Sequence, residues 1–246
     1  MPSSDLTEDA LLDGRIRVRQ PARGYRVNVD TLLLAAAVEA PAGARLMEAG
    51  CGVGAALLAV AARSENTRLL GIERDQNIAA IARENVALNA MTDRVEIATG
   101  DALERNANWG VFDGVFVNPP YDAENEGRMP AEARRHAHIT EVSLHEWVGA
   151  LADRLSGGAA LTMIHRAARA AELLAALEGR LGGVELIPIR PRAEAPAKRV
   201  IVRARKGSRA PLRLLRGLDL HDPSGGKYAP EIEAIVRGQA LVAWGD

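Results

Sequence analysis

The segment Asn118-Pro119-Pro120-Tyr121 brings together residue types that suit the chemistry of an amino group. It follows an apolar run, residues 111–117, whose pattern predicts a buried strand. Two prolines in succession end that strand, because neither can donate a hydrogen bond to a neighbouring strand. The side-chain oxygen of Asn118 and the carbonyl of Pro119 are then held where they can grip a planar amine. The ring of Tyr121 can stack on the ring that carries this amine.

A glycine-rich turn, residues 48–54, joins an earlier expected strand to a helix. Glycines let the backbone turn sharply and approach a ligand closely. Glu73 ends the next expected strand and can accept hydrogen bonds from two ribose hydroxyls, and Asp101 follows the third strand and can accept one from an adenine amine. Ligands of open α/β sheets bind outside the carboxyl ends of the strands. We therefore expect these residues and residues 118–121 to share one site.

These cofactor residues alone leave two other interpretations open. Gly50, Gly52 and Ala55 also fit the dinucleotide fingerprint with alanine in its last position, so a nicotinamide dehydrogenase is a rival. No separate substrate domain follows the glycine turn, and Asn-Pro-Pro-Tyr has no evident role in hydride transfer. A tight turn that binds nothing is the simplest alternative. It would require the glycine turn, Glu73 and Asp101 to occur in this order by chance.

The rest of the chain predicts the elements that hold these residues. The expected strands are residues 45–48, 69–73, 95–97, 111–117, 160–164, 184–189 and 200–205, and the expected helices are residues 31–38, 55–62, 76–88, 143–155, 167–177 and 231–237. This alternation implies a mostly parallel sheet with helices on both faces. Asp30 is expected either to cap the first helix or to lie over the cofactor. Residues 121–140 are too polar for a core element, and we expect a functional loop there.

Composition restricts the class of protein further. The chain has 246 residues, 48% of them apolar, with a formal net charge of −1 and one cysteine, Cys51, which excludes an internal disulfide and a cysteine-rich zinc site. No apolar run reaches the roughly 18 residues of a membrane span. The polar start predicts no signal peptide, and we expect a cytoplasmic protein.

The positive charge is unevenly distributed along the chain. Residues 190–216 contain ten lysines or arginines and one acid, Glu194, and residues 15–26 hold a second basic cluster. Charged runs are usually solvated faces. Ten cations on an otherwise neutral protein favour a track for RNA phosphates, which predicts RNA affinity that falls steeply with salt.

These motifs, taken in their order along the chain, resemble those of class I S-adenosylmethionine-dependent methyltransferases. The glycine motif of that family is similar to residues 48–54, with Glu48 where aspartate is commoner. Its ribose-binding acid matches Glu73, its adenine-contacting acid matches Asp101, and its amino-group motif matches residues 118–121. The resemblance implies a Rossmann-like α/β fold with a mostly parallel seven-stranded sheet whose last strand is antiparallel.

A narrower resemblance concerns the acceptor. The Asn-Pro-Pro-Tyr form is shared by adenine-N6 methyltransferases, protein glutamine-N5 methyltransferases and, in variants, guanine-N2 rRNA enzymes. Three further stretches, residues 20–35, 133–137 and 221–231, are similar to bacterial tRNA(Val) adenine-N6 methyltransferases. The whole similarity covers residues 15–240.

The resemblance implies three groups of site residues. The catalytic group is Asn118, Pro119, Pro120 and Tyr121. The cofactor-binding group is Asp30, Glu48, Gly50, Cys51, Gly52, Gly54, Glu73, Arg74, Asp101, Ala102 and Asn118. The substrate-binding group is Tyr121, Arg134, Arg135, Lys198 and Arg199. No metal ligand is expected.

The expected domain organisation follows the same resemblance. Residues 1–14 are expected to form a disordered tail and residues 15–246 a single methyltransferase domain. Within that domain, residues 15–42 would cover cofactor and substrate, residues 43–206 would form the catalytic core, and residues 207–246 would be a C-terminal extension.

The resulting hypothesis is methyl transfer from S-adenosylmethionine to the exocyclic N6 amine of an adenine in RNA, with tRNA as the favoured substrate and S-adenosylhomocysteine as product. The alternatives are a protein glutamine-N5 methyltransferase, an rRNA guanine-N2 methyltransferase, and a non-catalytic scaffold that binds cofactor and RNA. The basic stretches favour RNA, and the intact Asn-Pro-Pro-Tyr segment disfavours the scaffold. We expect a monomer or weak dimer with no membrane partner.

Overall fold

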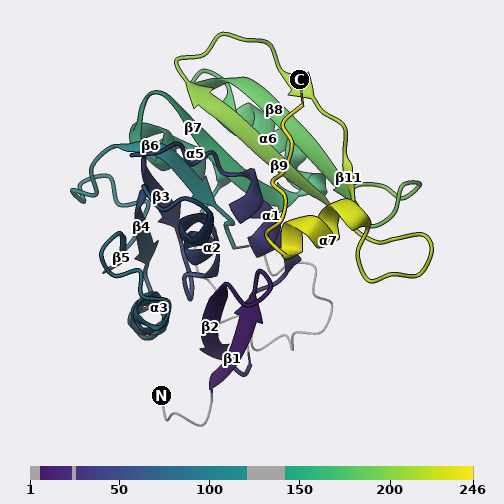
Figure 1. Ribbon diagram of the computed structural model, residues 1–246. Helices are drawn as coiled ribbons and strands as arrows, with labels where there is room; N and C mark the ends of the chain where they lie inside the picture. Colours follow the sequence, from purple (N-terminus) through teal and green to yellow (C-terminus); the bar gives the residue numbers. More distant parts are fainter. Residues whose placement is uncertain (1–5, 24–25, 121–141, 246) are drawn as a thin grey trace, which may run out of the picture.

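A mostly parallel sheet forms the centre of the computed structural model, which describes residues 6–23, 26–120 and 142–245 (Figure 1). The strand order is β10-β8-β9-β7-β6-β3-β4-β5, and β11 pairs with β8. The long strands are β3 (Arg45–Ala49), β4 (Arg68–Glu73), β5 (Val95–Thr99), β6 (Phe112–Val117), β7 (Leu155–Arg166), β8 (Leu181–Arg190) and β9 (Arg199–Lys206). Neighbouring strands are parallel except that β9 runs antiparallel to β7 and β8.

This sheet confirms the predicted α/β class and the antiparallel last long strand. The expected count of seven strands is wrong for the described residues, where the sheet has nine. The two additional strands, β10 (Arg213–Leu214) and β11 (Leu218–Asp219), pair parallel with the edge of β8. A two-residue strand is too short to show an alternation of apolar and polar residues, so neither strand can be predicted from the sequence pattern.

Two hydrophobic layers enclose the sheet. On one face, α1 (Val29–Ala37), α2 (Ala55–Arg63) and α3 (Gln76–Leu88) pack with residues such as Phe116. On the other face, α5 (Leu144–Asp153) and α6 (Ala170–Leu177) pack with residues such as Met163. Successive residues of a strand point to opposite faces, so buried strands are apolar along their whole length. No helix in the described part of the chain is long and apolar enough to span a membrane.

Helix α1 is buried over nearly all of its length, because the C-terminal part of the chain covers its outer side. Helix α7 (Pro230–Val236) contacts it, and the backbone N–H of Val242 donates to the carbonyl of Ala36 at 3.1 Å. The indole N–H of Trp244 donates to the carbonyl of Ala37 at 2.9 Å. Asn28 caps the helix, so Asp30 is not the cap and lies in the first turn.

The predicted disordered tail, residues 1–14, is wrong for residues 6–14. Strand β1 (Leu6–Leu11) pairs antiparallel with β2 (Ile16–Pro21) and forms a hairpin, seen at the bottom of Figure 1. Two carboxamides from α3 bind the free edge of β2. Asn89 exchanges hydrogen bonds of 2.8 and 2.7 Å with the backbone of Arg17, and Asn85 exchanges hydrogen bonds of 2.7 and 2.8 Å with that of Arg19.

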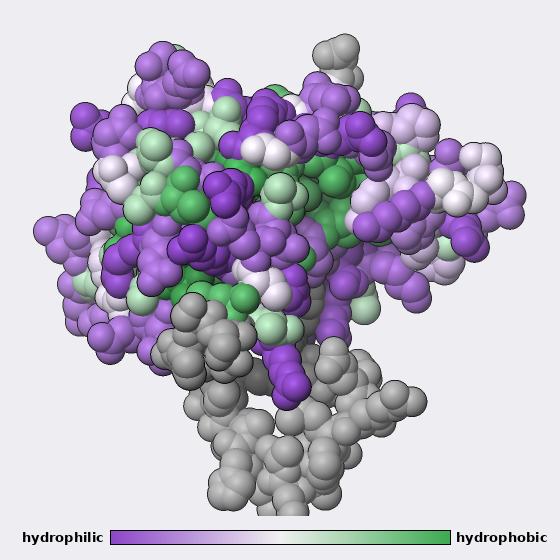
Figure 2. Space-filling view, turned by 60° about the horizontal axis from the view of Figure 1, so that its bottom comes forward, coloured by the Kyte–Doolittle hydropathy of each residue, from purple (hydrophilic) through white to green (hydrophobic). Residues whose placement is uncertain are grey.

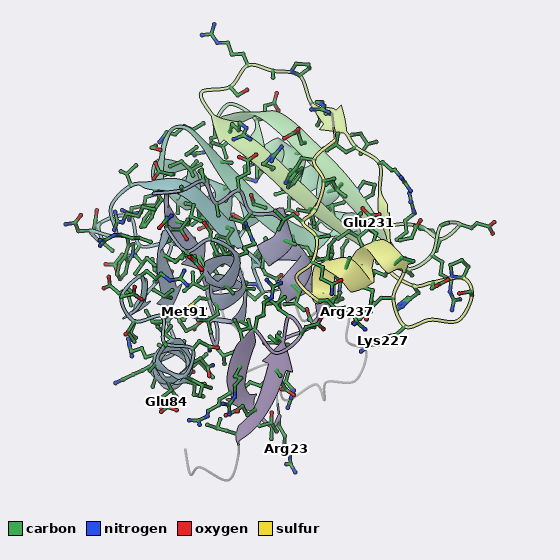
Figure 3. The ribbon with its side chains drawn as sticks, in the orientation of Figure 1. Arg23, Glu84, Met91, Lys227, Glu231 and Arg237 are labelled. Atoms are coloured by element: carbon green, nitrogen blue, oxygen red, sulfur yellow. The ribbon has the colours of Figure 1, made fainter. Side chains whose placement is uncertain are left out.

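These asparagines stand one helical turn apart, which matches alternate residues of the strand. Glu84, beside Asn85 in sequence, points outward from α3 (Figure 3). The hairpin is therefore held by partners more than 60 residues away, and local sequence does not reveal them.

Candidate active site

The carboxyl ends of β3, β4, β5 and β6 collect most of the predicted site residues at one edge of the sheet. This edge lies toward the bottom of Figure 1, and Figure 2 turns that side forward. There the surface is largely hydrophilic, with apolar patches between the polar side chains. The arrangement matches the position at which parallel sheets bind ligands.

The glycine turn forms an open backbone cradle between β3 and α2. Gly50, Gly52 and Gly54 have φ values of 66°, 56° and 83°, a region that favours glycine. A Cβ atom added at Gly50 or Gly52 would meet nothing within 4 Å, so the loop faces open space. The turn then enters α2, whose first N–H groups suit a ligand that carries a carboxylate.

Glu73 closes this cradle from the end of β4. Its Oε2 accepts a hydrogen bond from the N–H of Gly52 and its Oε1 accepts one from the N–H of Asp75, both at 2.9 Å. The carboxylate is half-buried. Each carboxylate oxygen accepts more than one hydrogen bond, so the same group can also receive the hydroxyls of a ribose. Arg74, the next residue, is exposed.

Glu48 lies at the end of β3 with 5% of its surface exposed. No described residue provides its Oε2 with a hydrogen-bond partner. Burial raises the pKa of this carboxyl well above its usual value, and the nearby Glu73 raises it further, while a backbone hydrogen bond at Leu57 acts in the opposite direction. A buried carboxyl of this kind suits a cationic ligand, which would favour its charged form.

Cys51 is a packing residue between the cradle and the sheet. Its side chain is buried, and its Sγ lies where a Cβ on Gly71 of β4 would come within 2.8 Å. Burial raises the pKa of the thiol well above its usual value. Any contact of Cys51 with a cofactor would therefore come from its backbone.

Asp101 follows β5 and is exposed, with its Oδ1 accepting a hydrogen bond from the N–H of Leu103 at 2.9 Å. No sequence motif singles out Trp109, whose indole N–H donates to the carbonyl of Asp101 at 3.2 Å. Its ring lies over Gly100, where a Cβ would come within 2.8 Å of it. Ala102 is buried in the core, so only its backbone is available to a ligand.

Asn118 and Pro119 stand directly beyond β6, next to the glycine cradle at the end of β3, with which β6 pairs. Phe116 packs on the α1 face, so Asn118, two residues further, projects to the same face. Its side-chain oxygen is buried, as is Pro119, whereas Pro120 is exposed. Tyr121, Arg134 and Arg135 lie outside the described residues.

Two residues predicted to have separate roles are bound to each other. Arg199, expected to bind substrate, donates from Nε to Oδ2 of Asp30, expected to bind cofactor, at 2.9 Å. Only 8% of the Asp30 side chain is exposed. Lys198 is exposed, and its carbonyl accepts hydrogen bonds from Arg199 and from the N–H of Ala167.

Much of the rest of the basic stretch lies away from the predicted site residues. Strand β9 runs antiparallel to β7 and leads away from this edge, so Arg203 and Arg205 lie farther from it than Arg199, and both bind Glu39. Glu185 binds Arg203 and Arg213, and Asp219 binds Arg190. The ten cations therefore do not form one continuous track, because acids distant in sequence pair with many of them.

Comparison with known proteins agrees with this geometry. The model of the methyltransferase small domain matches residues 24–142. A tRNA1(Val) (adenine(37)-N6)-methyltransferase of Porphyromonas gingivalis is 29% identical over 88% of this chain and 89% of its own length. The crystal structure of a predicted O-methyltransferase from Agrobacterium tumefaciens is 30% identical, covers 87% of this chain and 98% of its own, and superposes with a TM-score of 0.74.

A class I S-adenosylmethionine-dependent methyltransferase from Listeria monocytogenes, described as putative, shares the fold at 16% identity, with a TM-score of 0.60 over 89% of this chain and 74% of its own. The glycine cradle, Glu73 and the buried Glu48 are the parts of this chain that fit such a cofactor. The chain belongs to the S-adenosylmethionine-dependent methyltransferases.

Proposed function

We propose that this enzyme methylates the exocyclic N6 amine of an adenine in RNA, with tRNA as the preferred substrate. The observation that carries the proposal is the position of Asn118 and Pro119 at a strand end beside the cofactor cradle. Their two carbonyl oxygens suit an NH₂ group, whereas a hydroxyl acceptor has one hydrogen to donate. The Porphyromonas relative, named as a tRNA adenine-N6 methyltransferase, supports the same acceptor.

The cofactor supplies a methyl group bonded to a sulfonium sulfur. The residues of the cradle would hold it by its polar groups: Glu73 at the ribose, Asp101 and the backbone of Ala102 at the adenine, and Glu48 on the side of the cationic end. The open backbone at Gly50 and Gly52 lets the ligand lie close to the loop. Arg74 is exposed beside Glu73 and would lie at the ribose side.

Asn118 and Pro119 would act on the acceptor amine. Its lone pair is delocalised into the purine ring, so the amine is a poor nucleophile. Hydrogen bonds donated to the Asn118 oxygen and the Pro119 carbonyl would draw the nitrogen toward tetrahedral geometry and aim its lone pair at the methyl group. The bound cofactor would supply the methyl group to this nitrogen and keep the electron pair of the broken S–C bond on sulfur, and the nitrogen would lose a proton. Positioning of this kind can supply about 7–11 kcal/mol of the barrier reduction.

The target adenine must leave its own stack to reach this strand end. We propose that Tyr121 stacks on it, a contact worth about 1–3 kcal/mol. Arg134 and Arg135 would contact the RNA around the base, and Lys198 and Arg199 would do so from β9. We propose a cytoplasmic location for this reaction, in keeping with an RNA substrate of this kind.

Labelled methyl transfer to total tRNA, rRNA and release factors, assayed in parallel, tests the proposal. Mass spectrometry of the product should find N6-methyladenosine. N5-methylglutamine, N2-methylguanosine or a 2′-O-methylated nucleoside would each assign a different acceptor. An O-methylated product would agree with the name of the Agrobacterium structure and would overturn the role given to the two carbonyls.

Replacement of Asn118 tests the mechanism separately. The Asn118→Ala variant should lose turnover while its affinity for S-adenosylmethionine stays close to that of the parent enzyme. Asn66→Ala, an exposed asparagine before β4 at the opposite edge, is the matched control. Equal turnover in the Asn118→Ala variant and this control would refute the mechanism.

A further inference from the structure

Arg166, which no sequence motif singles out, lies directly opposite Arg199 in the sheet. The two are Cα partners in the antiparallel pairing of β7 and β9. Ile164 and Ile201, two residues from each arginine along its strand, pack on the α1 face, so both arginines project to that face. Like charges directly across a strand pair are unfavourable, so this arrangement is not one that packing alone would favour.

The pair lies on the same face and at the same edge as Asn118. Val117 of β6 is the Cα partner of Met163 of β7, so Asn118 lies beside Ile164. Arg166 is two residues further along β7. Typical strand spacing and rise then place the Cα atoms of Asn118 and Arg166 about 8 Å apart. A nucleotide holds its phosphate one sugar away from its base, which suits this separation.

Asp30 fixes one member of the pair in position. Its buried carboxylate accepts from Nε of Arg199 at 2.9 Å, and the carbonyl of Lys198 accepts from Nη1 at 3.1 Å. A guanidinium carries five N–H donors in a planar fork, so one group can bind a protein carboxylate and a phosphate at the same time. Helix α1, which carries Asp30, contacts β7 beside it.

Two acids of the described residues near this cluster bind other arginines. Glu172 of α6 binds Arg169 through hydrogen bonds of 2.6 and 2.7 Å. Asp219 binds Arg190 at 2.7 Å. Lys198, beside Arg199 in sequence, adds a further exposed cation.

We propose that Arg166 and Arg199 form a phosphate-binding pair for the RNA strand whose adenine reaches Asn118, with Asp30 as the residue that positions Arg199. The inference rests on the proposed function and assigns its phosphate contact to two arginines rather than to the whole basic stretch. Arginine suits the role because its fork binds phosphate with two parallel hydrogen bonds.

The experiment measures RNA binding by the full-length enzyme at several salt concentrations, independently of methyl transfer. Arg166→Ala should weaken RNA binding about tenfold, the effect of one lost charge-assisted contact. The slope of log affinity against log salt should fall by about one. Affinity for S-adenosylmethionine should stay unchanged. Arg166→Lys, which keeps the charge and loses the fork, should recover part of the affinity.

Arg209→Ala and Arg216→Ala are the matched controls, because both residues belong to the same basic stretch and are exposed. Neither should change the affinity or the slope. Asp30→Asn removes the carboxylate that positions Arg199 and retains the arginine itself, and it should weaken RNA binding in the same direction as Arg166→Ala.

The two proposals fail in different ways. The parent enzyme could methylate adenine in RNA while the Arg166→Ala variant binds RNA as tightly as the parent. That result would overturn the phosphate-binding pair without contradicting the proposed function. A loss in Arg209→Ala or Arg216→Ala equal to that in Arg166→Ala would also overturn it. Absence of any methylated RNA nucleoside with the parent enzyme would overturn the proposed function itself.

Discussion

Two regions of the sheet treat buried charge in opposite ways. On strands β8 and β9, Glu185 is 8% exposed and binds Arg203 and Arg213. Arg203 is stacked on Trp244, with its guanidinium carbon 4.2 Å from the ring centre, and also binds Glu39. At the site edge, Glu48 is 5% exposed, and no described residue provides its Oε2 with a hydrogen-bond partner.

The basic residues of β9 bind acids at both ends of α1. Arg203 and Arg205 bind Glu39, which follows the end of α1, whereas Arg199 binds Asp30 in its first turn and lies across from another arginine, Arg166. Buried charges that are paired hold elements together. A buried carboxyl such as Glu48, whose Oε2 has no hydrogen-bond partner among the described residues, costs stability, and such groups are concentrated where a ligand supplies the missing partner. The difference therefore separates the structural charges of β8 and β9 from the proposed binding edge.

Removing the charge of Arg203 should have the largest effect on stability. In Arg203→Ala, Glu185 would remain buried without its closest cation, and a broken buried pair costs about 3–5 kcal/mol. Urea unfolding followed by circular dichroism measures this loss. Arg205→Ala, a more exposed partner of Glu39, should cost less than about 1 kcal/mol. Similar losses of stability in both variants would contradict the distinction between buried and exposed ion pairs in this part of the sheet.

At the binding edge, Glu48→Gln should stabilise the enzyme in the absence of cofactor. The folded pKa of Glu48 is raised, so the folded state holds its proton at pH values where the unfolded chain has lost it. Stability therefore falls as pH rises above the usual value of 4.5 toward the folded pKa. The variant has no such proton, and above pH 7 it should be more stable by about 1–2 kcal/mol. Thermal melts from pH 5 to 9 measure the difference.

Binding of the cationic cofactor should release the proton of Glu48, because positive charge favours the carboxylate. Calorimetric titrations in buffers of different ionisation enthalpy measure the number of protons released. Glu48→Gln should release fewer protons than the parent and bind S-adenosylmethionine less tightly, by about tenfold. Equal proton release in parent and variant would show that Glu48 stays protonated and that its burial has another purpose.

Asp30→Asn should affect RNA binding more than stability, because Arg199 is partly exposed and water can replace the lost partner. We expect a loss of stability of about 1 kcal/mol, close to that of an ordinary hydrogen bond. Glu39→Gln at the other end of the helix should show the reverse, with RNA affinity unchanged. Chemical unfolding and RNA binding on the same preparations compare the two ends of α1 directly.

The smallest effect is expected at Cys51. The pKa of its buried thiol is raised, so little of the reactive thiolate forms at neutral pH. Folded enzyme should react with iodoacetamide far more slowly than unfolded enzyme, and Cys51→Ala should keep turnover within about twofold, since a small apolar residue fills the same place. Rapid alkylation with loss of activity would instead indicate an accessible thiolate beside the cofactor.

Much of the binding edge was predictable because its parts obey local rules. Glycines that require positive φ, an acid at a strand end and a proline-terminated strand are recognisable in sequence, since each depends on residues close in the chain. The structure places Glu48, Gly52, Glu73 and Asn118 together as expected. It describes no part of the predicted contacts at Tyr121, Arg134 and Arg135, which stay predictions.

Trp109 and Arg166 were not predictable in the same way. The indole of Trp109 donates a hydrogen bond to the carbonyl of Asp101, eight residues earlier. Trp109 lies in a loop whose sequence has no hydrophobic periodicity, so no pattern indicates this contact. Arg166 becomes notable only when the antiparallel pairing of β7 and β9 sets it across from Arg199. The N-terminal hairpin likewise depends on Asn85 and Asn89 of a distant helix.

The sequence by itself determined the parallel α/β sheet, the glycine turn and the proline-terminated strand end proposed to meet the acceptor amine. Only the tertiary structure decided which charges are paired within the fold and which buried carboxyl is left for the proposed ligand. Hydrophobic periodicity and glycine conformation depend on a few neighbouring residues, so both can be recognised in the sequence. The effect of a charge depends on its distance from other charges in space and on its burial. Arg199 and Arg203 are four residues apart on one strand, and the acids that meet them, Asp30 and Glu39, come from opposite ends of α1.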